Sequence, residues 1–321
     1  MATADQLKSL IKSHFEDDEE RFTTTAMQVA AHEARQGHSA VAHEIRSLID
    51  RARTRPKLVP FRRDLDDLVT VSEPTNRLSD LVLVDDARKR IERVLREFRQ
   101  QDKLHKHGLN HRRKLLLTGP PGTGKTLTAS VLAGELHLPL YTVLMDKLVT
   151  KFMGETSAKL RQVFDAIGEH QGVYLFDEFD AIGAERGFEN DVGEMRRVLN
   201  SFLQFIEADQ SYSLIVAATN NVRLLDQALF RRFDDVLRYA LPTGSEIERL
   251  VANHTAGFST RDFPLAQIVE SAASLSHAEI AQACDDAIKE AVLGDQPAVS
   301  VETLRSMLAE RQSAYRARSN D

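Results

Sequence analysis

Residues 119–126 read Gly-Pro-Pro-Gly-Thr-Gly-Lys-Thr and fit the pattern G-x-x-x-x-G-K-[ST]. This loop follows the apolar run Leu115–Leu117 and precedes a segment of helical character that begins near Thr126. Glycines let a backbone curl so that consecutive N–H groups and a helix N-terminus point at phosphate oxygens. Lys125 adds a positive charge for the β- and γ-phosphates, and the Thr126 hydroxyl is a hard oxygen ligand suited to Mg²⁺. The stretch therefore predicts a nucleotide-phosphate site between a strand and a helix.

Apolar runs of four to six residues recur on both sides of this loop, separated by segments with helical patterns. Such runs are typical of parallel strands buried on both faces of a sheet. They are Leu115–Gly119, Leu140–Val143, Val173–Phe176 and Leu214–Thr219. After Pro242 the pattern is helical throughout, over Glu246–His254, Leu265–Ser274, His277–Leu293 and Val301–Arg316. We therefore expect an α/β core, a parallel sheet between helices, followed by a smaller helical unit.

Two adjacent acidic residues, Asp177 and Glu178, come directly after the apolar run Val173–Phe176. The carboxyl end of a buried parallel strand is the edge of the sheet where ligands bind. Asp177 can hold Mg²⁺ through water, and Glu178 can polarise an attacking water or accept its proton. The pair therefore predicts that the nucleotide is hydrolysed as well as bound.

Residues 1–52 carry apolar residues at helical spacing, with Gly37 as a helix stop, and indicate a bundle of about three helices. Residues 53–75 contain two prolines and many Arg and Lys residues, which is typical of an exposed linker. The expected organisation is a helical bundle at 1–52, a basic linker at 53–75, the α/β core at 76–240 and a helical unit at 241–321.

The composition gives no global attraction to polyanions, because 42 Lys and Arg face 48 Asp and Glu for a net charge of -6. The single cysteine, Cys284, excludes an internal disulfide framework. No apolar run approaches the ~18 residues of a membrane span, and the N-terminus turns acidic where a signal peptide would continue. These features predict a cytoplasmic protein with no membrane partner, and they argue against nucleic acid as a partner.

With GPPGTGKT (119–126) and LFDEFD (175–180), residues 76–292 resemble the AAA subgroup of the AAA+ ATPases. The resemblance implies a P-loop core with a C-terminal helical lid, ATP and Mg²⁺ as cofactors, and assembly into a ring, with a hexamer expected. It implies that Asn220 orients the attacking water together with Glu178. It also implies that Arg231 and Arg232 reach the neighbouring subunit's γ-phosphate, and either could be the principal finger because the Pro-Gly that often separates the pair is missing.

The resemblance further assigns the contacts with ATP and Mg²⁺. Thr126 and Asp177 would hold the metal, Val82 would pack on the adenine, and Ala278 lies where the lid meets the nucleoside. The full set of nucleotide-binding residues is Val82, Gly119, Pro120, Pro121, Gly122, Thr123, Gly124, Lys125, Thr126, Leu127, Asp177 and Ala278.

Residues Lys151, Phe152, Met153 and Gly154 occupy the place of the family's pore loop, which grips an extended polypeptide. Phe and Met adapt to many side chains, which suits gripping without sequence preference. Residues 185–194 match a second loop facing the pore. The expected function is ATP-driven unfolding or remodelling of protein substrates, with any degradation left to a separate protease or reached through an adaptor.

Three alternatives stay open at this stage: an ATPase that activates or dismantles complexes without full threading, a nucleotide-gated scaffold, and a DNA-loading ATPase. The last is disfavoured by the acidic charge and by the lack of an arginine in the lid segment LSHAEIAQACDDA (275–287). A zinc protease site is also disfavoured, because His32 and His38 are six residues apart and not four. The bundle at 1–52 would select substrates or partners.

Overall fold

A computed structural model of the chain describes residues 8–9, 12–13, 19–36, 38, 41–42, 45, 65, 67–148, 153–179, 191–221, 227–258 and 263–318. The chain divides into two compact units, Met1–Pro60 and Phe61–Asp321. In the first unit, helix α2 (Glu19–Arg35) buries Ala26, Val29 and Ala30. This spacing of three and four residues places the three side chains on one face of the helix. Helix α2 ends two residues before Gly37, where the sequence indicated a helix stop.

The second unit is built on a six-stranded sheet in the order β1-β3-β4-β5-β2-β6. Strand β1 runs antiparallel to β3, and every other neighbouring pair is parallel. The strands are β1 (Val69–Ser72), β2 (Lys114–Thr118), β3 (Leu140–Val143), β4 (Val173–Phe176), β5 (Leu214–Thr219) and β6 (Asp235–Arg238). The four strands predicted from apolar runs are confirmed, and they form the continuous parallel centre of the sheet.

The two edge strands were not predicted, because neither is a continuous apolar run. Three of the four residues of β1 are exposed, and only one residue of β6 is buried. Edge strands contact one neighbour only, so their sequences need less apolar character than central ones. Strand β1 lies in the segment 53–75, which the sequence indicated as linker.

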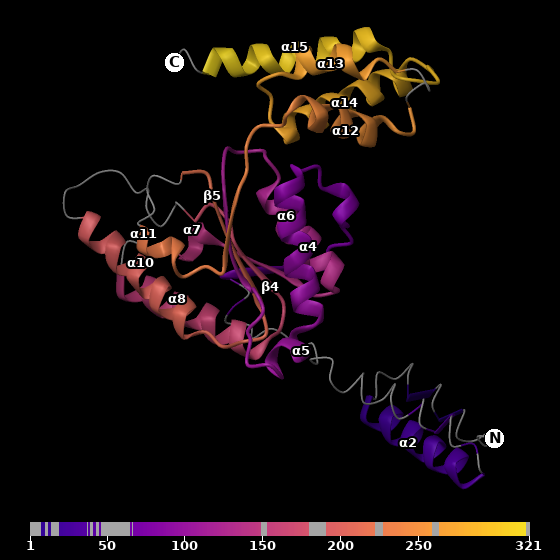
Figure 1. Ribbon diagram of the computed structural model, residues 1–321, viewed down its shortest axis with the longest axis vertical. Coiled ribbons are helices and arrows are strands. Elements are labelled where there is room, and N and C mark those ends of the chain that lie inside the picture. The colour runs from indigo at the N-terminus through magenta and orange to yellow at the C-terminus, as the bar shows by residue number, and fades with distance from the viewer. Residues whose placement is uncertain are drawn as a thin grey trace. The chain divides into compact units, whose positions relative to one another are not determined.

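Helices cover both faces of the sheet (Figure 1). On one face, α4 (Asp85–Arg99) and α6 (Lys125–Leu136) share a core with β2 and β5. On the other, α8 (Met153–Glu169) and α10 (Asp191–Ala208) enclose a cluster of phenylalanine rings. In that cluster Phe202 meets Phe176 edge to face at 5.2 Å between ring centroids. A hydrophobic core packs against each face of the sheet. The loops at the carboxyl edge therefore start from well-packed strands.

The C-terminal helices form a separate core of their own, as the sequence predicted. They are α12 (Gly244–Thr255), α13 (Leu265–Ala272), α14 (His277–Leu293) and α15 (Val301–Arg318). Each boundary lies within about two residues of the expected one. Ser276 caps α14, where its hydroxyl accepts a hydrogen bond from the Glu279 N–H and the Glu279 carboxylate accepts one from the Ser276 N–H. This capping box fixes where α14 begins.

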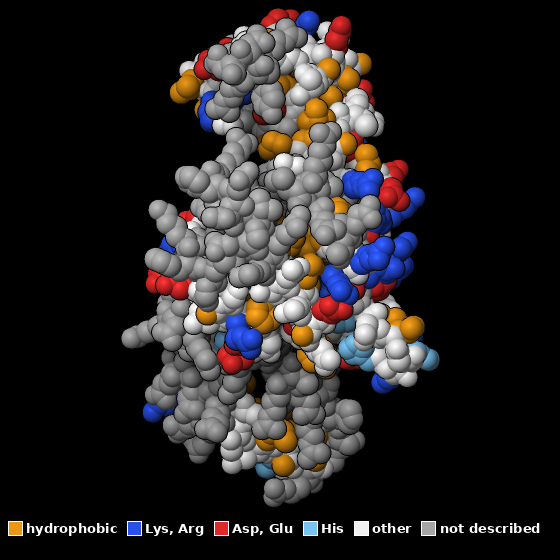
Figure 2. Space-filling model, turned by 90° about the vertical axis from the view of Figure 1, so that its left-hand side faces the viewer, with side chains coloured by type: hydrophobic (Ala, Val, Ile, Leu, Met, Phe, Trp, Pro, Cys, Tyr) orange, Lys and Arg blue, Asp and Glu red, His pale blue; other side chains and the backbone are white. Residues whose placement is uncertain are grey.

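Basic side chains gather on one side of the described surface (Figure 2). Helix α4 contributes exposed Lys89, Arg93 and Arg96, which follow one another at helical spacing. Other arginines of the same region are paired, such as Arg99 with Glu135 at 2.8 Å. The positive charge is therefore local, within a chain whose net charge is -6.

His111 is a buried histidine immediately before β2. It is 5% exposed, it meets the Phe98 ring edge to face at 5.4 Å, and neither of its ring nitrogens has a hydrogen-bond partner among the described residues. Burial first, and then the positive charges of Arg113 and His105, lower the pKa of His111 below its ordinary value of 6.5, although Asp234 and Glu97 act in the opposite direction. The folded protein therefore favours the neutral ring.

Acid is expected to destabilise the second unit through His111. The free energy of unfolding should be unaffected by this residue above about pH 6.5 and should decrease as the pH falls below that value, because the unfolded chain binds the proton more readily. Denaturant titrations at pH 7.5 and pH 5.5 measure the decrease. The His111→Leu variant should lose less stability between the two pH values than the unaltered protein, whereas the control His107→Leu, at an exposed site, should not differ from it. Equal losses in all three proteins would contradict this prediction.

Candidate nucleotide site

The loop Gly119–Thr126 joins β2 to α6, between a strand and a helix as the sequence predicted. Two of its glycines are required by close packing. A Cβ at Gly119, where φ is 148°, would lie 2.3 Å from the Tyr239 carbonyl oxygen, and a Cβ at Gly122, where φ is 71°, would lie 2.5 Å from the Ser276 hydroxyl. Only glycine avoids both the strained backbone and the clash. The loop is therefore packed between the end of β6 and the start of α14.

Lys125 is the first residue of α6 and is 6% exposed. Its ammonium group donates hydrogen bonds to the carbonyl oxygens of Gly119 and Pro120, at 2.8 and 2.7 Å. These bonds hold the cation over the loop, beside the N–H groups of the helix N-terminus. A buried cation and a helix N-terminus together form an anion site, and phosphate oxygens would replace the loop carbonyls as partners of the ammonium.

Thr126 and Asp177 meet directly at the end of β4. The Thr126 hydroxyl donates a hydrogen bond to Asp177 Oδ2 at 2.5 Å, and Asp177 Oδ1 accepts one from the Glu178 N–H at 2.9 Å. A hydroxyl and a carboxylate are hard oxygen donors, and Mg²⁺ in nucleotide sites takes one or two such ligands together with waters and phosphate oxygens. The donor set at Thr126 and Asp177 therefore fits Mg²⁺.

Glu178 and Asn220 lie at the carboxyl ends of neighbouring parallel strands. Phe176 of β4 pairs with Ala217 of β5, so the residues that follow each strand come out at the same edge of the sheet. Glu178 has a φ of 50°, which is rare for a residue with a side chain. Phe179, which is fully buried, donates its backbone N–H to the Ala218 carbonyl at 2.8 Å and anchors this turn. The strained backbone leaves the Glu178 carboxylate exposed while its neighbours are fixed.

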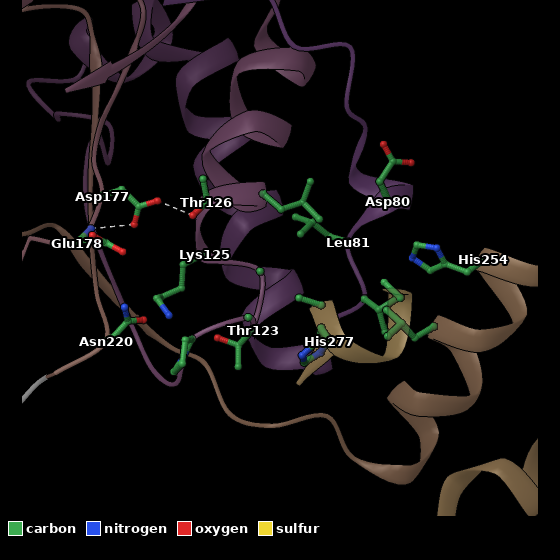
Figure 3. Close-up of a pocket in the computed structure, with 18 residues that line it drawn as sticks. Asp80, Leu81, Thr123, Lys125, Thr126, Asp177, Glu178, Asn220, His254 and His277 are labelled. Atoms are coloured by element: carbon green, nitrogen blue, oxygen red, sulfur yellow. Dashed lines mark hydrogen bonds between the residues drawn. The ribbon is translucent and has the colours of Figure 1, made fainter. Parts of the chain in front are cut away.

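A cavity of about 450 Å³ connects these groups with the C-terminal helices. Figure 3 shows Asp177, Glu178 and Asn220 at one end and Asp80, Leu81 and His254 at the other, with Thr123 and His277 between them. The second end is mostly apolar, and Val82 there also belongs to the core of the C-terminal helices. A cavity of this size, charged at the phosphate end and mostly apolar at the other, matches a nucleotide with its phosphates on the loop and its base under the lid.

Most of the predicted nucleotide-binding residues line this one cavity: Val82, Pro121, Gly122, Thr123, Gly124, Lys125, Thr126, Leu127, Asp177 and Ala278. Glu178 and Asn220 line it as well. Gly119 and Pro120 lie behind it and hold Lys125. The sequence reasoning missed Asp80, Leu250, His254 and Ala281, which line the base end. Leu250 and His254 lie four residues apart on α12 and therefore share one face of that helix. This helical spacing is the sequence signal that could have indicated them, since they belong to no sequence motif.

Arg231 and Arg232 do not line the cavity of their own chain. They follow the short helix α11 (Gln227–Phe230), and both are exposed. Arg232 forms an ion pair with Glu207 at 2.5 Å, whereas Arg231 has no hydrogen bond or ion pair with any residue that the structure describes.

Of the predicted pore loop, Lys151 and Phe152 lie outside the described residues. Met153 and Gly154 begin α8, and their side chains lie outside the description too. The second pore-facing segment, 185–194, is described only from Asp191, where α10 begins.

Residues 115–241 match the ATPase family associated with various cellular activities (AAA). The chain is 34% identical over 305 residues to the uncharacterized AAA family ATPase y4kL of Sinorhizobium fredii. The aligned stretch covers 91% of this chain and 90% of that protein. The chain therefore belongs to the AAA family of ATPases, and it hydrolyses ATP.

Two further relatives share a shorter stretch. A protein of Methanothermobacter thermautotrophicus, named as a homologue of a 26S proteasome regulatory subunit, is 29% identical over 62% of this chain and 55% of its own length. The ATP-dependent zinc metalloprotease FtsH 4 of Sphaerobacter thermophilus is 29% identical over 74% of this chain but only 37% of its own length. Among the described residues, no helix combines the length and apolar character needed to cross a bilayer.

Proposed function

We propose that this ATPase forms a ring, with a hexamer expected, and uses ATP hydrolysis to unfold or remodel protein substrates. The observation that carries the proposal is that the nucleotide cavity has no arginine among its described lining residues, while Arg231 and Arg232 are exposed elsewhere on the same unit. Phosphoryl transfer to water commonly needs an arginine against the developing charge. A neighbouring subunit would supply it, and the site would be complete only between two copies.

Within one subunit the groups divide the chemistry as follows. Lys125 and the loop N–H groups bind the β- and γ-phosphates, and Glu178 takes a proton from the attacking water. Asn220, beside Glu178 at the same edge of the sheet, orients that water. Mg²⁺, held by Thr126 and Asp177, would neutralise charge on the phosphate oxygens. Each of these roles is a proposal, supported by the position of the residue around one cavity.

A polypeptide is the proposed substrate because the predicted pore loop ends where α8 begins, on the chain between β3 and β4. Two relatives have names that refer to proteolysis, a metalloprotease and a proteasome regulatory subunit homologue. Those names describe those proteins. For this chain they support a role in handling polypeptides, with a separate protease or adaptor as a partner and the predicted bundle at residues 1–52 as the part that selects substrates.

The test is to replace Phe152 with alanine. Steady-state ATP hydrolysis should stay within about twofold of the unaltered protein, because the resemblance assigns Phe152 to the polypeptide and not to the nucleotide. A hydrolysis-deficient Glu178→Gln protein that carries Phe152→Ala should no longer retain bound polypeptide on purification. Tyr212→Ala serves as the matched control, since Tyr212 is an aromatic residue that is 59% exposed and far in sequence from the predicted pore loop. Equal loss of hydrolysis and of polypeptide retention would contradict the pore-loop role.

A further inference from the structure

Tyr239 follows β6 and contacts the chain on both sides of the phosphate loop. Its backbone N–H donates a hydrogen bond to the carbonyl of Thr118, the last residue of β2, at 2.7 Å. Its hydroxyl lies 2.7 Å from the hydroxyl of Thr128, near the start of α6. Along the chain, the loop Gly119–Thr126 lies between these two contacts. Tyr239 therefore links the strand before the loop to the helix after it.

Thr128 connects the Tyr239 hydroxyl to the loop itself. The Thr128 hydroxyl and its backbone N–H both donate hydrogen bonds to the Gly124 carbonyl, each at 2.9 Å. A threonine hydroxyl carries one proton, so it accepts the proton of the Tyr239 hydroxyl while it donates its own to Gly124. Burial raises the pKa of Tyr239 to about 12, although the hydrogen bond with Thr128 acts in the opposite direction, so the phenol keeps that proton at neutral pH. Thr128 is fully buried and Tyr239 is 7% exposed, so little water competes for these bonds.

The Gly124 carbonyl shares a peptide unit with the Lys125 N–H. The carbonyl and the N–H of a trans peptide unit point in opposite directions. Because the carbonyl points into α6 toward Thr128, the Lys125 N–H points out of the helix N-terminus. Gly124 has a φ of 95°, and nothing lies within 4 Å of the place where its Cβ would be, in contrast to the close contacts at Gly119 and Gly122. Hydrogen bonds to its carbonyl, and not close packing, therefore fix the orientation of this peptide.

We infer that Tyr239 is a positioning residue of the phosphate site: through Thr128 it orients the Gly124–Lys125 peptide, so that the N-terminus of α6 faces the phosphates. The inference rests on the proposed nucleotide site and adds to it a hydroxyl that touches neither the nucleotide nor the metal. Neither Tyr239 nor Thr128 lines the cavity. Both therefore act on the phosphates only through the loop backbone.

The chain offers a matched control for each hydroxyl. Tyr174 is a fully buried tyrosine whose hydroxyl donates hydrogen bonds to the Ala166 and His170 carbonyls, at 3.0 and 2.9 Å. Thr255 is a fully buried threonine of α12 whose hydroxyl donates to the carbonyl of Val251, four residues before it, at 2.8 Å. Neither control residue lines the cavity. Each control removes the same kind of buried hydrogen bond from a place without contact to the loop.

The experiment measures the binding of ATP and of inorganic tripolyphosphate by calorimetry, and the free energy of unfolding of each variant. Tyr239→Phe should weaken the binding of both ligands equally, by about threefold to tenfold, the effect of losing one hydrogen bond. Tyr174→Phe should lose a similar free energy of unfolding but keep both affinities within about twofold. Thr128→Val should weaken both ligands as well, whereas Thr128→Ser, which keeps the hydroxyl, and the control Thr255→Val should not.

A double variant tests whether the two hydroxyls act in one chain. Tyr239→Phe combined with Thr128→Val should bind both ligands no more weakly than Thr128→Val alone, because both substitutions interrupt the same link. This variant also leaves neither of the two hydroxyls buried without a partner. Losses of affinity that add up independently would overturn the inference.

The other outcomes separate this inference from the site on which it rests. Unchanged affinities in Tyr239→Phe, or an equal loss of affinity in Tyr174→Phe, would overturn the inference and leave the nucleotide site intact. Weaker ATP binding with unchanged tripolyphosphate binding would also overturn it, since the effect would then reach the nucleoside and not the phosphates. Failure of the unaltered protein to bind either ligand would overturn the proposed site and the inference with it.

Discussion

Replacing both Arg231 and Arg232 with alanine is expected to reduce ATP hydrolysis by about 10³- to 10⁵-fold, the range measured for arginines supplied to other phosphoryl-transfer sites. The physical reason is that Lys125 is the one lysine or arginine among the described residues lining the cavity. Without an added guanidinium, the charge that develops on the γ-phosphate oxygens is stabilised from one side only. ATP binding should be retained, because neither arginine contacts the cavity of its own chain.

Action between subunits is tested by mixing. Subunits with both arginines replaced keep an intact phosphate site, and Lys125→Ala subunits keep intact arginines, so neither protein alone should hydrolyse ATP. Mixed together, they should recover part of the activity. Arg93→Ala, at an exposed site on α4, is the control for loss of surface charge and should have no effect. An inactive mixture would exclude arginines acting in trans.

Single variants then measure how much each of the two arginines contributes to ATP hydrolysis. Arg232 must leave its ion pair with Glu207 to reach a neighbour, whereas Arg231 has no such bond to break among the described residues. Exposed ion pairs contribute little, about 0 to 1 kcal/mol, so this pair does not by itself rule out Arg232. The larger loss of turnover in one single variant identifies the principal finger.

Replacing Glu178 with glutamine is expected to slow ATP hydrolysis by about 10²- to 10⁴-fold, the usual contribution of a general base, and to leave ATP bound. Glutamine has nearly the same shape but cannot take the proton from the attacking water. The turn is held by Phe179 and by the bond from the Glu178 N–H to Asp177, neither of which involves the Glu178 carboxylate, so the fold should be unaffected.

Steady-state turnover and ATP affinity, measured on the same preparation, check this prediction. Glu270→Gln, an exposed carboxylate of α13, is the matched control and should be indistinguishable from the unaltered protein. Unchanged hydrolysis in Glu178→Gln would remove Glu178 from the mechanism. It would also reopen the role assigned to Asn220, which is proposed to orient the same water.

The centre of the sheet could be predicted because β2, β3, β4 and β5 are almost wholly buried, so their sequences are largely apolar. The phosphate end of the site could be predicted for a related reason. A loop that wraps phosphates needs glycines at fixed places, and Gly119 and Gly122 prove to have no room for a side chain. In both cases one local segment of sequence carries the whole physical constraint.

The base end of the cavity could be predicted only in part, at Val82 and Ala278, and only from the resemblance to the family. Asp80 comes from the segment before α4 and His254 from α12, and packing alone brings these distant positions together. The edge strands β1 and β6 were not predicted, because half-exposed strands can contain polar as well as apolar residues and then show no continuous apolar run.

The two tight glycines have a mechanical consequence. Gly119 abuts Tyr239, the residue from which the chain leaves the sheet toward α12, and Gly122 abuts Ser276, where α14 begins. The phosphate loop thus lies under both attachment points of the helical lid. Neither contact has room for a side chain, so we expect a displacement of the loop backbone to be transmitted to both attachment points. We therefore expect the position of the lid to depend on whether phosphate occupies the loop.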